Sequence, residues 1–86
     1  MRGQVYMEYS RLGFFAVQTE ENYFSIIEVQ SKLPSLLNKL IGDLDSLGEK
    51  TLYNEATQEE INVSIVSTQL TLAEAKSYIK NAVRGK

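Results

Sequence analysis

The chain has 86 residues, 43% hydrophobic and 23% charged, a formal net charge of -2, and neither cysteine nor histidine. This length suits a single domain, residues 1–86, with one small core, and the composition is that of a globular chain. The absence of cysteine excludes disulfide scaffolds and thiolate metal sites. The absence of histidine removes the side chain that most often transfers protons near neutral pH.

Residues 4–29 are predicted to form a three-stranded meander. Residues 4–9 alternate apolar and polar side chains, residues 14–19 follow the turn "SRLG", and residues 23–29 are rich in aromatic and β-branched residues. The connections "SRLG" and "EEN" are short. Loops of this length place neighbouring strands antiparallel.

The meander carries apolar residues on both faces. The face expected to line the core holds Val5, Met7, Phe15, Val17, Ile27 and Val29. The second face holds Tyr6, Phe14, Ala16, Phe24 and Ile26. Three explanations of this second face stay open: a helix or barrel closure covers it, a homodimer buries it, or it binds a ligand.

Residues 32–47 are predicted to form an amphipathic helix. Ser31 can cap it, and Pro34 would fall in the first turn, where a missing N–H breaks no helical hydrogen bond. Apolar residues recur at spacings of three and four, as on one helical face. They are Leu33, Leu36, Leu37, Leu40, Ile41, Leu44 and Leu47.

Residues 49–67 are predicted to form a hairpin, because residues 51–53 suit a short strand and residues 61–66 alternate apolar and polar side chains. Residues 72–84 are predicted to form a C-terminal helix. The preceding "TLAE" fits a capping box, and Leu72, Ala75, Ile79, Ala82 and Val83 give the helix its buried face.

The element order βββαββα predicts an α+β fold, a five-stranded, mainly antiparallel sheet with two amphipathic helices. Two helices on one sheet face would give their many apolar residues enough partners. The alternative is an OB-like small barrel with an added C-terminal helix, because three meander strands, a helix and two further strands is the OB-fold order.

The segment "RLGFFAV", residues 11–17, resembles the aromatic nucleic-acid-binding strand of cold-shock domains, in which a basic residue and a glycine precede aromatic residues. The resemblance implies an OB-like binder of single-stranded nucleic acid. Phe14, Tyr6 and Phe24 would stack on bases, and Arg11 with the C-terminal cations would contact phosphates. The acidic balance of the meander argues against this function.

The leading hypothesis is a small non-enzymatic protein-interaction or regulatory module that self-associates or binds an unidentified protein. Its contact surface would include the second face of the meander. The predicted binding residues are Tyr6, Arg11, Phe14, Phe24 and Ile26. No catalytic residue, metal ligand or cofactor is predicted, since the glycines are scattered and the acidic pairs lie in turns.

Charge divides unevenly along the chain. Residues 1–70 hold 5 basic and 10 acidic side chains, a local -5, whereas residues 71–86 hold Lys76, Lys80, Arg84 and Lys86 against Glu74, a local +3. Helix-end cations usually complement the helix dipole.

The packing of the C-terminal helix separates the hypotheses. Cations of that helix flanking the aromatic face would favour nucleic acid. If Ile79 and Val83 lie across this face instead, both binding hypotheses lose their surface there.

No apolar run approaches the roughly 20 residues of a membrane span, and we predict a soluble, cytoplasmic protein.

Overall fold

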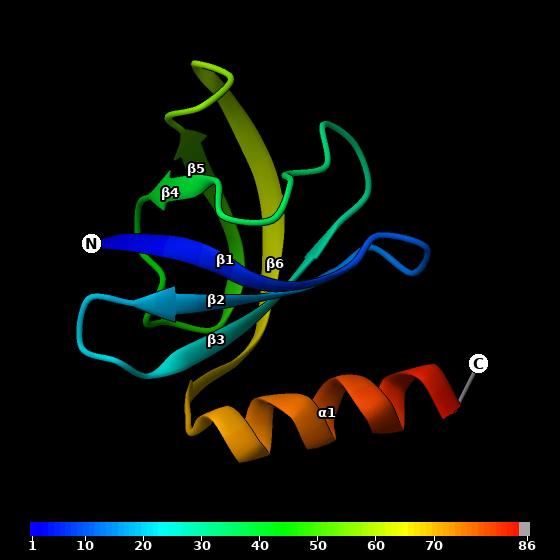
Figure 1. The fold of residues 1–86 in the computed structure, drawn as a ribbon. Helices are drawn as coiled ribbons and strands as arrows, with labels where there is room; N and C mark the ends of the chain where they lie inside the picture. The colour runs from blue at the N-terminus through cyan, green and yellow to red at the C-terminus, as the bar shows by residue number, and fades with distance from the viewer. Residues whose placement is uncertain (85–86) are drawn as a thin grey trace.

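The computed structural model describes residues 1–84, although the side chains of Val83 and Arg84 lie outside the described part. Figure 1 labels the elements, which are β1 (Arg2–Tyr9), β2 (Phe14–Thr19), β3 (Phe24–Val29), β4 (Lys39–Ile41), β5 (Gly48–Asn54), β6 (Glu59–Leu70) and α1 (Leu72–Arg84). The predicted place of Val83 on the buried helix face therefore lies outside the described side chains.

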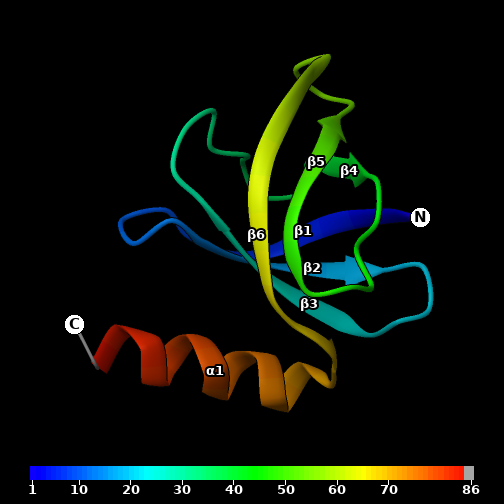
Figure 2. The same ribbon diagram turned by 180° about the vertical axis from the view of Figure 1, so that it is seen from behind.

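The strands form a closed antiparallel barrel in the order β1-β2-β3-β6-β5-β4. Two meanders, β1–β3 and β4–β6, are joined where β3 pairs with β6 and where β1 pairs with β4. Helix α1 lies outside the barrel, below the strands in both views (Figures 1 and 2). The prediction of a five-stranded sheet with two helices was wrong, whereas its alternative, a small barrel with a C-terminal helix, is confirmed.

The barrel encloses an interior core of fully or almost fully buried side chains. These are Val5, Phe15, Val17, Ile27, Val29, Leu40, Leu44, Leu52, Ile61, Val63 and Ile65. At Gly3 an added Cβ would lie 2.6 Å from Val17 Cγ1 and 2.7 Å from Leu44 Cδ1. Contacts this close show that the interior is filled.

A second apolar cluster, the outer cluster, lies between the meander and α1. Its buried members are Phe14, Ala16, Phe24, Ile26 and Ala75, and Met7, Tyr9, Leu12, Val66, Leu70, Leu72, Tyr78, Ile79 and Ala82 pack against them partly buried. The two faces of the meander therefore both bury apolar surface, one inside the barrel and one beneath the helix.

Met7 lies in the outer cluster and not on the core face where alternation placed it. The register of β1 against β2 shifts between Val5, which pairs with Val17, and Met7, which pairs with Ala16. This bulge adds one residue, Tyr6, to β1, and an extra residue moves every later side chain to the other face of the strand. Alternation alone does not reveal such an insertion.

The predicted helix over residues 32–47 is absent. Backbone φ angles of 54° at Lys32 and 71° at Leu37 are incompatible with a right-handed helix. Residues 39–41 instead form β4, which pairs with both β1 and β5. Barrel closure needs this strand, so tertiary pairing overrides the helical spacing of the leucines.

The leucines of this segment divide between two environments. Leu40 and Leu44 are buried in the interior core, whereas Leu33, Leu36, Leu37 and Leu47 are exposed. The exposed stretch is held against β1, because the Leu37 amide donates to the Val5 carbonyl at 2.8 Å and the Leu36 amide donates to Glu8 Oε2 at 3.1 Å. This stretch is therefore a loop that hydrogen bonds hold against β1.

The predicted hairpin is present as β5 and β6, but β6 continues to Leu70. Its first part sends Ile61, Val63 and Ile65 into the barrel. Its pairing with β3 then shifts register, and Val66 and Leu70 join the outer cluster. One long strand therefore contributes to both apolar clusters and leads directly into α1.

The predicted C-terminal helix and its capping box are confirmed. The Thr71 backbone amide donates to Glu74 Oε1 at 2.9 Å, and the Glu74 amide donates to Thr71 Oγ1 at 3.2 Å. Both contacts satisfy donors that a helix N-terminus leaves without a partner. The box fixes the point where the chain leaves β6 and turns along the outer cluster.

Replacing Thr71 with alanine is expected to cost about 0.5–2 kcal/mol of unfolding free energy, because the Glu74 amide loses its acceptor. Urea denaturation followed by circular dichroism measures this loss. Thr57 lies exposed in the turn before β6, so Thr57→Ala is the control and should change stability by less than about 0.5 kcal/mol. Equal effects of the two variants would contradict a role for the cap.

Candidate functional site

Three of the five predicted binding residues lie beneath α1. Phe14, Phe24 and Ile26 belong to the buried part of the outer cluster, and only 4% of the Phe24 surface is exposed. Ile79 of α1 packs against this cluster. While α1 is docked, these side chains cannot contact a partner. A helix therefore covers the second face of the meander, as the first of the three explanations expected.

Tyr6 and Arg11 remain exposed, but no open aromatic face joins them to the other predicted residues. Tyr6 is 43% exposed, and its ring and that of Phe24 pack in a T-shaped pair with a centroid distance of 5.2 Å and an interplanar angle of 75°. Arg11 lies in the turn between β1 and β2. Tyr6 therefore forms the rim of the outer cluster and not a separate stacking platform.

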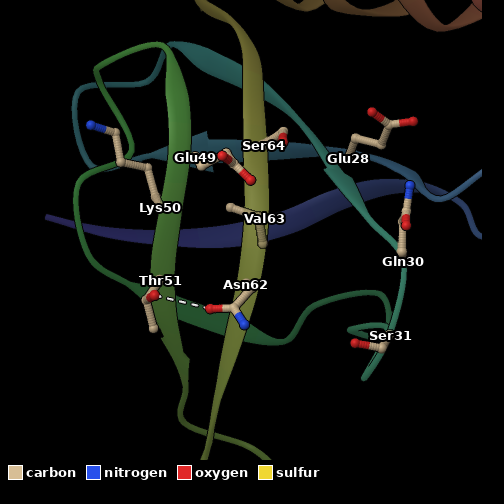
Figure 3. Close-up of a pocket in the computed structure, with 9 residues that line it drawn as sticks. All are labelled: Glu28, Gln30, Ser31, Glu49, Lys50, Thr51, Asn62, Val63 and Ser64. Carbon is tan, nitrogen blue, oxygen red and sulfur yellow. Dashed lines mark hydrogen bonds between the residues drawn. The ribbon is translucent and has the colours of Figure 1, made fainter.

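A groove of about 570 Å³ runs over the outer wall formed by β3, β6 and β5 (Figure 3). Most of its lining side chains are polar. They are Glu28, Gln30, Ser31, Glu49, Lys50, Thr51, Asn62, Val63 and Ser64. The interior core occupies the inward side of these strands, and the groove exposes polar side chains to solvent on their outer side.

Strand register places the polar groups in rows across the wall. Ser64 of β6 pairs with Glu28 of β3 on one side and with Glu49 of β5 on the other. In the next row Thr51 pairs with Asn62, and its hydroxyl donates to Asn62 Oδ1 at 3.0 Å. Figure 3 shows these side chains coming from three adjacent strands. The groove therefore presents the carboxylates of Glu28 and Glu49 on either side of the Ser64 hydroxyl.

Lys50 lines the groove, but its ammonium group is engaged elsewhere. Lys50 Nζ lies 3.3 Å from Asp43 Oδ2, and Figure 3 shows this side chain pointing away from Glu28. The pKa of Asp43 is lowered, mainly because Lys50 donates a hydrogen bond to it. Lys50 is thus paired with Asp43, and the carboxylates of Glu28 and Glu49 supply the charge of the groove.

The groove was not predicted from the sequence, although part of its signal was visible. Alternation in residues 61–66 placed Asn62 and Ser64 on the face opposite the apolar side chains. The pairing of that face with Glu28 depends on the contact between β3 and β6, which are far apart in the sequence.

The chemistry of the groove suits a cationic partner that also donates hydrogen bonds. Carboxylates favour ammonium and guanidinium groups, and the amide and hydroxyl groups offer further acceptors and donors.

Within residues 1–84 no group of three or more His, Cys, Asp or Glu side chains is arranged to hold a metal ion. In the same part of the chain, no helix has both the length and the apolar character needed to cross a membrane.

Comparisons with protein-family models, with curated proteins and with solved structures found no significant match to this chain.

Proposed function

We propose that this chain is a small non-enzymatic protein-interaction module whose contact surface is the groove on β3, β6 and β5. The observation that carries the proposal is the row Glu28–Ser64–Glu49, in which two carboxylates flank a serine hydroxyl in one groove. The charge of -5 on residues 1–70 adds a field of the same sign. The partner we expect is a basic, extended protein segment.

A nucleic-acid-binding function, the second hypothesis, has weaker support. Burial of Phe14 and Phe24 beneath α1 removes the aromatic rings on which bases would stack. The groove that remains open carries carboxylates, which repel phosphates. The same features that favour a basic protein segment therefore argue against single-stranded DNA or RNA.

Binding of a fluorescent peptide of alternating lysine and serine residues tests the proposal. An exposed ion pair contributes about 0.2–1 kcal/mol, so the double variant Glu28→Gln/Glu49→Gln should bind this peptide about 2- to 30-fold more weakly. Fluorescence anisotropy at low salt measures the affinity. A single-stranded DNA and an RNA oligonucleotide of equal length should give no saturable binding.

The matched control is Glu20→Gln/Glu21→Gln, which removes the same charge from the exposed turn between β2 and β3. It should leave the peptide affinity close to that of the wild type. If the control weakens binding as much as the groove variant does, the peptide responds to net charge alone, and the groove is not the contact surface.

A further inference from the structure

Helix α1 presents a basic stripe on its solvent side. Lys76 and Lys80 are exposed and lie one helical turn apart, so they share one face of the helix. Neither takes part in an ion pair among the described residues. Glu74 accepts a hydrogen bond from the Thr71 amide in the capping box and forms no ion pair with either lysine.

The groove and the basic stripe carry opposite charge in different parts of one molecule. Residues 1–70 have a local charge of -5 and residues 71–86 a local charge of +3. The apolar side of α1 is committed to its own barrel, because Ala75 and Ile79 belong to the outer cluster. Among the described side chains of α1, the exposed side that holds Lys76 and Lys80 is therefore available to a second molecule while α1 stays docked.

The lysine side chains are long enough to reach both carboxylates. Glu28 and Glu49 stand two strand spacings apart, about 10 Å between their Cα atoms. Lys76 and Lys80 are separated by about 6 Å along the helix axis, and their long, flexible side chains can spread to both carboxylates. Ala73 and Ser77, small and exposed on the same side of α1, let a helix approach the groove closely.

We propose that the basic partner of the groove is a second copy of this chain, which inserts the Lys76–Lys80 stripe of its α1 between Glu28 and Glu49. The inference rests on the proposed function, because it names the partner of the same groove. Contact between two different surfaces forms either a closed pair, in which each groove holds the other helix, or a longer head-to-tail assembly.

Variants with reversed charges test whether the groove of one copy binds the basic stripe of another. One variant carries Glu28→Lys/Glu49→Lys and the other carries Lys76→Glu/Lys80→Glu, all at exposed or partly exposed positions. We expect the wild type to show at least a doubled mass by light scattering at high concentration and low salt, and a monomer mass in 0.5 M salt, about five times the ionic strength at which the screening length is about 10 Å. Each variant alone should be monomeric, and an equimolar mixture should regain the wild-type mass.

Three results would overturn the inference: a wild type that stays monomeric at every concentration, variants that each associate as the wild type does, or a mixture that remains monomeric. Circular dichroism spectra establish that both variants fold. If a lysine or glutamate variant fails to fold, Glu28→Gln/Glu49→Gln and Lys76→Gln/Lys80→Gln replace it. Each of these must then lower the mass of the wild-type assembly.

The peptide experiment separates failure of this inference from failure of the proposed function. A monomeric wild type that binds the lysine–serine peptide through Glu28 and Glu49 overturns self-association and retains an interaction module with another basic partner. A wild type that neither associates nor binds the peptide overturns both. Association that survives Glu28→Gln/Glu49→Gln would place the contact between copies outside the groove.

Discussion

Replacing Phe24 with lysine is expected to abolish the folded state at room temperature. Phe24 belongs to β3 and is only 4% exposed, because it is buried beneath α1 among Phe14, Ile26 and Ala75. A lysine there would bury an ammonium group without a partner, which costs several kcal/mol, out of the roughly 5–15 kcal/mol that stabilise a typical domain. Thermal unfolding followed by circular dichroism should show no cooperative transition.

The control is Phe24→Leu, which keeps an apolar side chain at the same position. It leaves a smaller space beneath α1 and should preserve a cooperative transition at a lower temperature. A folded Phe24→Lys protein of unchanged mass would contradict the packing of α1 over this face. A folded variant of halved mass would instead place Phe24 between two copies of the chain.

Leu40→Ala is expected to lower the unfolding free energy by about 2–5 kcal/mol. Leu40 is 0% exposed in the interior core and is the central residue of β4, the strand that closes the barrel. Truncation removes apolar contacts and leaves a cavity that neighbouring strands, fixed by pairing on both sides, cannot fill. Urea denaturation measures the change in midpoint.

Leu36→Ala is the matched control, because it makes the same chemical change at a side chain that is 48% exposed. Its effect should stay below about 0.5 kcal/mol. The helical spacing of residues 32–47 would instead place both leucines on one buried face and give both variants a large effect. Equal, large losses of stability would therefore contradict β4 and the exposed loop that precedes it.

The meander and the C-terminal helix were predictable because their signals are local. Short turns dictate antiparallel neighbours, strand alternation identifies the inward side chains, and the capping box marks the start of α1. The bulge at Tyr6 was not predictable, because β1 shows no glycine or other local marker there. It changes the side of the sheet on which Met7 lies.

The leucine-rich segment misled the prediction because its spacing fits a helix better than a strand of three residues. Pro34 and Gly42 were signals against a long helix, but Pro34 fits a first helical turn and Gly42 can lie within a helix at a cost of about 1 kcal/mol. The pairing partners of β4, at Arg2–Gln4 and at Tyr53 and Asn54, lie far away in the sequence. A strand formed mainly by such long-range pairing leaves little trace in local periodicity.

For the candidate site, the sequence identified apolar residues on a second face but not what covers them. An amphipathic helix must bury its apolar side, yet periodicity does not tell against which surface. Once α1 covers Phe14, Phe24 and Ile26, the open surface shifts to polar residues that sequence patterns assign to solvent. Their convergence depends on the pairing of β3 with β6.

The shortness of β4 has a consequence for the motion of the barrel. β4 pairs with β1 at three positions and with β5 at two, whereas β5 pairs with β6 at seven. Local opening at β4 breaks few hydrogen bonds and leaves the wall that carries α1 intact. In hydrogen–deuterium exchange, the backbone amides of Leu40 and Ile41 should therefore lose protection well before those of Val63 and Ile65. The barrel would open transiently at β4 while the other strand pairs stay closed.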